Sequence, residues 1–581
     1  MPGFSKSPQD DASGPELFLV DGIGPFFRAA KAERINWSKI PFHDLPEEAA
    51  FWEKLRGEFA SLADQVRALG YNAVTLDDLA HLTPHPWHDE ETNRRIGFFV
   101  EEFRLLFGIL RERGLRIWLT SDVLTMSPAV EERVGPDGGA RNAFFLDLVR
   151  RFFGEFPEVE GLILRIGEAD GLDVRDPLRS YLHLKSPKEV NGFLRDLLPE
   201  TEALGKKVVL RTWTVGAHRI GDLIWHRGRL GDTLRGIDSP NFILSMKPGE
   251  SDFFRHLPLN RAFFGYEGPK ILELQARREY EGAGEIPSYL GFSLEKTRDE
   301  LAGVKNLVGV SVWAQTGGWH RFKRLTFLDE NAFWAELNTR AAIDLFQKGL
   351  TPEQSLAAQV GAEKSAAAVE FLHHADHVMT QLYYIPEFAR LKLFFRRVRI
   401  PPLLHLYWDS LFIHSPIRKL LRHFVTDHEA AIREGVGAMR RFPRMIELAE
   451  ELAWPVEDVE CMRDTCGLIA LAREYYFSDF DEEIVERIEV AKKAYKKAWP
   501  REKRARYRIK TDFAPPKLKR RTVAWASRLL LRDKRAYRPV MDHFFTLNVL
   551  SFLYRLFRNR SQDALPKFVR KSAMGIDSLF R

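Results

Sequence analysis

One arrangement of hydrophobic and polar positions repeats along the chain between residue 16 and about residue 320. Apolar residues recur every three or four positions, a glycine follows, and a short aliphatic run then ends in a polar residue. The first such helical pattern has one apolar face, made by Leu55, Phe59, Leu62, Val66 and Leu69. Gly70 comes next, as expected where a helix ends in a left-handed backbone conformation. The repeat therefore predicts helices alternating with strands.

The repeat predicts eight short strands. They are Leu17–Val20, Ala73–Leu76, Ile117–Thr120, Leu162–Ile166, Val208–Thr212, Phe242–Met246, Ile271–Leu274 and Val308–Trp313. Their nearly continuous apolar runs are typical of parallel strands buried on both faces. Eight strand–helix units close into an α/β fold, the (β/α)8 TIM barrel. An open doubly wound sheet is disfavoured, because Asp21-Gly22-Ile23-Gly24 lacks the third glycine of a dinucleotide-binding loop.

Beyond about residue 330 the strand pattern stops, and long helical patterns cover residues 363–384, 430–452 and 483–499. We therefore expect four parts along the chain. These are an extended N-terminus (1–15), the catalytic barrel (16–330), an all-α C-terminal domain (331–500) and a basic helical extension (501–581). The basic stretch from 500 to about 519 contains two adjacent prolines and is interpreted as a linker or exposed crossover.

The net charge of +6 conceals an uneven distribution. Residues 501–581 hold 22 Lys and Arg against 6 Asp and Glu, whereas residues 1–500 hold 65 against 75. The basic extension is expected to face an anionic surface, or else to be a solvated helical surface. Cys461 and Cys466 are the only cysteines, which argues against a disulfide framework and a zinc site. With no apparent signal peptide or membrane-spanning run, a cytoplasmic protein without metal or cofactor is expected.

In a TIM barrel the active site lies where the C-terminal ends of the strands meet, so polar residues just past each strand are candidates. They are Asp21, Asp77, Asp78, Asp122, Arg165, Glu168, Arg211, Trp213, Lys247, Asp252, Glu279, Trp313 and Trp319. Glu168 follows the fourth strand and is placed to donate a proton, although it could instead pair with Arg165 or Arg211. Asp252 and Glu279 come from the loops after strands six and seven.

The three carboxyl groups could flank one sugar ring. Catalytic carboxyl groups about 6.5–9.5 Å apart leave room for a water and invert the anomeric centre, whereas about 5–5.5 Å indicates retention, and both stay open here. Arg165, Arg211 and Lys247 on neighbouring strands suggest an anionic substrate, although single cations at such ends are usually ion-pair partners. Trp213, Trp313 and Trp319 offer flat faces for a sugar, or belong to the core.

With these residues identified, residues 160–320 resemble the α-glucuronidases of glycoside hydrolase family 67. The stretch from Gly161 to Glu168 resembles the family segment that carries the catalytic acid, with Arg165 in place of Lys. Leu210-Arg211-Thr212-Trp213 resembles a segment whose Arg contacts the uronate carboxylate. The loop from Lys247 to Phe253 has the family pattern Lys-x-Gly-x-x-Asp-Phe, and the stretch from Glu273 to Gly282 has Glu-x-Gln-x-x-x-Glu-Tyr-x-Gly.

The resemblance implies an inverting glycoside hydrolase acting on a uronic-acid-containing glycoside. Glu168 would be the general acid, and Asp252 or Glu279 would take a proton from the attacking water. An oligosaccharide or uronoside substrate is implied as partner, and a homodimer is left open. The alternative is a catalytically inactive barrel that binds an anionic glycan, a membrane surface or nucleic acid through the basic extension. No specific nucleic acid is predicted, because no recognition motif is present.

Overall fold

The computed structural model describes most of the chain up to residue 514. The described residues are 15–30, 39–166, 176–213, 220, 223, 228–315, 324–391, 394–395, 398–399, 402–407 and 409–514. Predictions that fall on residues 1–14 or on the basic extension beyond residue 514 lie outside this range and stay predictions. Among the helices within it, none is long and apolar enough to cross a membrane.

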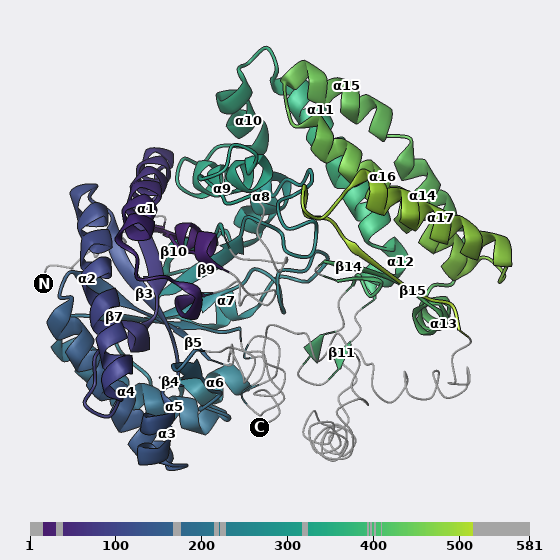
Figure 1. Cartoon of the computed structure of the whole chain (residues 1–581). Helices are drawn as coiled ribbons and strands as arrows, with labels where there is room; N and C mark the ends of the chain where they lie inside the picture. Colours follow the sequence, from purple (N-terminus) through teal and green to yellow (C-terminus); the bar gives the residue numbers. More distant parts are fainter. Residues whose placement is uncertain are drawn as a thin grey trace, which may run out of the picture.

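Eight parallel strands form a closed barrel, which lies at the left of Figure 1. The strands are β1 (Leu17–Asp21), β2 (Ala73–Asp77), β3 (Arg116–Asp122), β5 (Val159–Arg165), β7 (Lys207–Arg211), β8 (Phe242–Met246), β9 (Lys270–Gln275) and β10 (Leu307–Trp313). Each pairs with its two neighbours in the spatial order β1-β10-β9-β8-β7-β5-β3-β2. All eight predicted strands and the TIM-barrel fold are confirmed, with small differences at the strand ends.

Side chains from alternate strand positions fill the barrel interior. They are Leu17, Leu19, Ala73, Trp118, Ile163, Val209, Ile243 and Ile271. The intervening residues, such as Phe18 and Val20, join the larger core beneath the helices. Trp118 occupies space that Gly161 leaves free, because a Cβ on Gly161 would lie 2.8 Å from the Trp118 ring. The barrel is thus a packed core rather than a channel.

Helices cover the outside of the barrel (Figure 1). They are α1 (Ala49–Leu69), α2 (Glu90–Glu112), α3 (Pro128–Val134), α4 (Gly138–Glu155), α5 (Pro187–Ala203), α6 (Arg229–Leu234), α7 (Ala262–Gly265), α8 (Gly291–Glu300) and α9 (Phe333–Phe346). Gly70 ends α1 with a φ of 121°, as its position after the apolar face predicts. The Tyr71 hydroxyl donates to the Thr339 carbonyl oxygen in α9 at 2.8 Å. α9 therefore packs against the barrel and covers the end of the strand–helix series.

The chain beyond α9 is mainly helical, as predicted, and lies at the upper right of Figure 1. Its helices are α10 (Pro352–Val360), α11 (Ser365–Val378), the π-helical turn η5 (Met379–Tyr383), α12 (Pro386–Arg390), α13 (Ser415–Phe424), α14 (His428–Met439), α15 (Phe442–Leu452), α16 (Val456–Phe477) and α17 (Glu482–Ala498). A three-stranded sheet accompanies these helices. It consists of β13 (Leu406–Tyr407), β14 (Ser410–His414) and β15 (Arg508–Asp512), and a strand pair β11 (Phe394–Phe395) and β12 (Val398–Arg399) lies nearby in sequence.

The segment from residue 500 to about 519 is interpreted from its sequence as a linker or exposed crossover, but residues 504–509 within it pack against the protein. Arg504 is 3% exposed, and its guanidinium donates to the buried Asp458 carboxylate at 2.6 Å. β15 pairs in parallel with β14 and buries Tyr507 and Ile509 on alternate positions. The interpretation was wrong for these residues because the strongly basic composition concealed the short alternation of buried and partly exposed side chains.

Candidate active site

Glu273, a buried carboxylate on β9, connects β7, β8, β9 and β10 at the C-terminal end of the barrel. The Arg211 guanidinium donates to its two oxygens at 2.8 and 3.2 Å, and Ser245 Oγ and Trp313 Nε1 donate at 2.9 and 3.1 Å. Arg211 also lies 4.7 Å from the centre of the Trp313 ring. Burial would raise the pKa of Glu273, but the Arg211 charge and these hydrogen bonds lower it to about 2. Glu273 is therefore ionised and fixed at neutral pH.

Asp252 lies in the loop after β8 and is held on both carboxylate oxygens. Lys247 Nζ contacts Oδ1 at 2.5 Å, and the Tyr280 hydroxyl donates to Oδ2 at 2.6 Å. The Lys247 ammonium lies 4.6 Å from the centre of the Trp213 ring and 4.0 Å from that of Phe253. Residues that follow β7, β8 and β9 therefore meet around the Lys247–Asp252 pair.

Glu279 lies in the loop after β9, and only 7% of the residue is exposed. Its backbone N–H donates to Gln275 Oε1 at 2.9 Å, which ties the loop back to its own strand. Burial raises the pKa of Glu279 to about 8, the negative charge of Asp252 adds to the rise, and Lys247 opposes it. Glu279, with its raised pKa, thus lies beside a second carboxyl group, an arrangement suited to moving a proton.

Arg165, at the end of β5, is fully buried among the carboxylates of β2 and β3. Its Nε lies 2.9 Å from Asp122 Oδ1, and its Nη2 lies 3.5 Å from Asp77 Oδ1. Lys39 contacts the second oxygen of Asp122 and donates to Ser180 Oγ at 2.8 Å. Burial raises the pKa of Asp77 to about 6, although the Arg165 charge opposes the rise. Arg165 thus forms ion pairs with carboxylates at the ends of two other barrel strands, β2 and β3.

His81 lies beside this second group of charges and between two carboxylates. Its ring nitrogens lie 3.4 Å from Asp78 Oδ2 and 3.3 Å from Asp176 Oδ2, and its ring stacks on Phe42 at 4.0 Å. Burial would lower the pKa of His81, but Asp176 and Asp78 raise it to about 9. A small cavity at the ends of β2, β3 and β5 is lined by His81 together with Lys39, His43, Asp77, Asp78, Asp122, Arg165 and Asp176.

The structure brings five of the predicted site residues together on the arc from β7 to β10. They are Arg211, Trp213, Lys247, Asp252 and Glu279, and Trp313 joins them through Glu273. Arg165 stands on the adjacent strand β5 and is turned toward β2 and β3. Glu168 and Trp319 lie outside the described residues, so their roles stay predictions. Among the residues described, no group of three or more His, Cys, Asp or Glu is arranged to hold a metal ion.

Several residues of the site were not singled out from the sequence. Glu273 and Tyr280 are fixed positions of the Glu-x-Gln-x-x-x-Glu-Tyr-x-Gly pattern, so the pattern contained a signal for both. Lys39 and His81 had no such signal. They reach the strand ends from loops after β1 and β2, and only the closed barrel shows that these loops meet.

No protein-family model and no curated protein sequence matches this chain. Similar solved structures include a GH138 enzyme targeting pectin rhamnogalacturonan II, with 12% identity over 84% of this chain and 62% of that chain, and a TM-score of 0.49. This chain thus spans less than two thirds of that enzyme. An O-GlcNAc hydrolase from Thermobaculum terrenum gives 11% identity, 76% and 85% coverage, and a TM-score of 0.37.

A D-psicose 3-epimerase from Clostridium cellulolyticum H10 gives 16% identity over 50% of this chain and 94% of that chain, with a TM-score of 0.31. The neighbours thus include glycoside hydrolases and a sugar epimerase. Likenesses this weak do not distinguish between chemistries built on a common barrel. The barrel assignment is therefore supported by the chain's own strand pairing, and the chemistry has to be argued from the side chains.

Proposed function

We propose that the protein is a glycoside hydrolase in which Asp252 and Glu279 activate the attacking water. The observation that carries the proposal is the carboxyl pair itself, placed by neighbouring strands at the C-terminal end of the barrel beside Lys247. Enzymes that cleave glycosidic bonds use carboxyl groups both to supply a proton to the leaving oxygen and to remove one from water, and we assign the second task to this pair.

Glu279 is the better candidate for the general base. Both oxygens of Asp252 already accept contacts, Oδ1 from Lys247 and Oδ2 from Tyr280, so that carboxylate is held in place. Glu279 has a raised pKa of about 8, near the operating pH at which a general base is most effective. In this assignment the charge of Asp252 keeps Glu279 basic, and Lys247 orients Asp252.

Two finer parts of the proposal draw support from the local resemblance to family 67. Glu168 would protonate the leaving glycosidic oxygen, and the reaction would invert the anomeric carbon. A uronic acid would be the preferred sugar, because Arg211 and Lys247 put positive charge on the arc that carries the carboxyl pair. Each of these cations already contacts a protein carboxylate, so a substrate carboxylate would share the cation with Glu273 or Asp252.

The test is turnover of an aryl α-glucuronide and the matching aryl α-glucoside by the full chain. Glu279→Gln and Asp252→Asn should each lower kcat by at least about 100-fold, because the first removes the base and the second removes the charge that keeps Glu279 basic. Proton NMR of the first sugar anomer released reports inversion or retention.

Glu300→Gln is the matched control, because Glu300 is an exposed carboxylate at the end of α8, 3.8 Å from Lys296, and should leave turnover unchanged. The proposal would be overturned if folded wild type cleaves neither glycoside, or if Glu279→Gln and Asp252→Asn are as active as the control. The first result would favour a non-catalytic barrel that binds an anionic glycan.

A further inference from the structure

The loops that carry Asp252 and Glu279 are braced against each other by a buried ion pair. Arg255 lies in the Asp252 loop and Glu281 in the Glu279 loop. The Arg255 guanidinium donates from Nε and Nη2 to the two carboxylate oxygens of Glu281, at 3.0 and 2.9 Å. The Glu281 side chain is 2% exposed, and Arg278 also donates to it, from Nε at 2.7 Å. A two-fold guanidinium–carboxylate contact constrains direction as well as distance between the loops.

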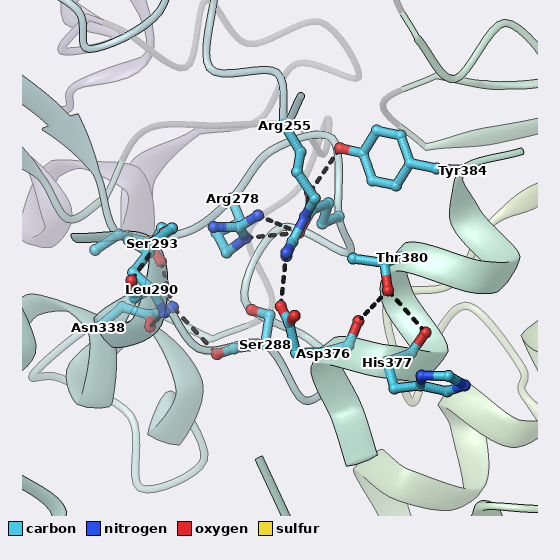
Figure 2. A network of polar contacts seen from close by, with 12 residues as sticks. Arg255, Arg278, Ser288, Leu290, Ser293, Asn338, Asp376, His377, Thr380 and Tyr384 are labelled. Carbon is cyan, nitrogen blue, oxygen red and sulfur yellow. Dashed lines mark hydrogen bonds and ion pairs between the residues drawn. The ribbon is translucent and has the colours of Figure 1, made fainter. Parts of the chain in front are cut away.

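The same ion pair is held from outside the barrel by the helical region, as Figure 2 shows. Arg255 Nη1 donates to Asp376 Oδ1 in α11 at 2.6 Å, and the Tyr384 hydroxyl donates to Glu281 Oε1 at 2.6 Å. Tyr384 directly follows the π-helical turn η5, and it is fully buried. Thr380 Oγ1 donates to the Asp376 carbonyl oxygen at 2.9 Å and so ties η5 to α11.

The ends of the Glu279 loop are fixed separately by one residue of α9. Asn338 Nδ2 donates to the carbonyl oxygens of Ala276 and Ser288 at 3.0 and 3.3 Å, and Asn338 Oδ1 accepts from the Leu290 N–H at 2.7 Å (Figure 2). The loop is thus anchored at both ends by the barrel, while its middle is fixed through Glu281. The helical region therefore contacts the loop two residues from Glu279, through the Tyr384 hydroxyl on Glu281.

We propose that Asp376 and Tyr384 are positioning residues, through which the helical region sets the separation of Asp252 and Glu279 and thereby completes the active site. The inference rests on the proposed function for its consequence on turnover, but the positioning itself has a readout that needs no substrate. Neither residue reaches the carboxyl pair, so each acts only through Arg255 and Glu281.

Asp376→Asn and Tyr384→Phe in the full chain test the proposal. Each should lower kcat about 10-fold and leave KM within about two-fold, because a misplaced catalytic group affects the chemical step more than binding. Asp376→Glu should recover part of the loss. Glu370→Gln is the matched control, since Glu370 lies on the same helix α11 and pairs with Arg444 at the surface.

The second readout is the basicity of Glu279, which depends on its distance from Asp252. A carboxyl group whose pKa is raised in the folded state stabilises the fold less as pH rises. For Glu279 this loss occurs between its ordinary pKa of 4.5 and its folded-state pKa of about 8. The Tm of wild type should therefore fall relative to that of Glu279→Gln between pH 5 and pH 9. In the Asp376→Asn and Tyr384→Phe backgrounds the change of this Tm difference with pH should be smaller, whereas in the Glu370→Gln background it should be the same as in wild type.

The two readouts separate the two proposals. If wild type is inactive but its Tm difference from Glu279→Gln changes in the Asp376→Asn and Tyr384→Phe backgrounds, the glycosidase proposal is refuted and the positioning role is supported. If wild type is active, and neither kcat nor the Tm difference from Glu279→Gln changes in the two variants, the positioning role is refuted, even if the Tm of the variants falls. If Asp376→Asn does not fold, Tyr384→Phe decides, because it removes one hydroxyl and keeps the ring.

Discussion

At the scale of single residues, their partners give two buried carboxyl groups of one arc opposite pKa shifts. Glu273 lies on β9 and Glu279 in the loop that follows it, yet the pKa of Glu273 is lowered to about 2 and that of Glu279 is raised to about 8. Both are buried, and the difference comes from their partners. Glu273 has the Arg211 guanidinium on both oxygens, whereas Glu279 faces another carboxylate, Asp252. The first is suited to holding a structure and the second to transferring a proton.

Glu273→Gln should be strongly destabilising, because it leaves the Arg211 charge buried without its main partner. The expected loss at pH 7 is about 3–5 kcal/mol, against less than about 0.5 kcal/mol for the exposed control Glu300→Gln. Because the folded-state pKa of Glu273 is lowered, its stabilisation is present above 4.5 and is lost as pH falls toward about 2.

Thermal unfolding at pH 7 and at pH 3 measures both effects of Glu273→Gln. The Tm gap between wild type and the variant should narrow at pH 3. A variant that is as stable as the Glu300→Gln control at pH 7 would show that the contacts of Glu273 contribute little to the fold.

At the scale of elements, the barrel strands could be predicted because each carries its own signal. Continuous apolar runs ended by polar residues are local features, and all eight appear as strands. The sheet formed by β13, β14 and β15 could not be predicted in this way. Its pairing joins residue 410 to residue 508, and β15 contains a single aliphatic side chain, Ile509. Its stability comes from contacts distant in sequence, which a local pattern does not contain.

Gly161 illustrates how one element constrains its neighbours in the barrel. A Cβ at this position would lie 2.3 Å from the Lys207 carbonyl oxygen on the paired strand β7 and 2.8 Å from Trp118. Gly161→Ala should therefore destabilise the protein by about 1–3 kcal/mol through overpacking. Gly154→Ala, on α4 with no atom near the added Cβ, should be neutral or stabilising.

Urea unfolding of the two alanine variants provides the comparison. We expect Gly161→Ala to unfold at a lower urea concentration than Gly154→Ala. Equal midpoints would mean that β5 can move away from β7 at no cost, contrary to the close packing of the barrel.

At the scale of the whole molecule, the barrel and the helical region share buried charges. Asp458 of α16 accepts from Arg324 at 2.9 Å, from Arg504 at 2.6 Å and from Trp334 Nε1 of α9 at 2.8 Å. Arg504 also donates to the carbonyl oxygen of Glu285 in the loop after β9. A basic segment near the end of the described chain therefore reaches the loop that carries Glu279.

The sequence predicted which loops carry the site, but not how the loops are held. Asp252 and Glu279 could be found because they follow strands and belong to recognisable spacings. Asp376 and Tyr384 could not, since they lie in a helical pattern about 100 residues further along, and only the folded chain brings them to Arg255 and Glu281. A spacing pattern identifies residues that are close in sequence, whereas contacts from the helical region to these loops exist only in the tertiary structure.

The central claim is that the carboxyl pair of Asp252 and Glu279 performs the chemistry, with Glu279 as the base. Its most direct test is the pH dependence of kcat/KM on an aryl α-glucuronide. We expect kcat/KM of wild type to rise with pH through an apparent pKa of about 8, and we expect no such rise in the residual activity of Glu279→Gln. A rate that falls through pH 8, or a rise that persists in Glu279→Gln, would contradict the claim.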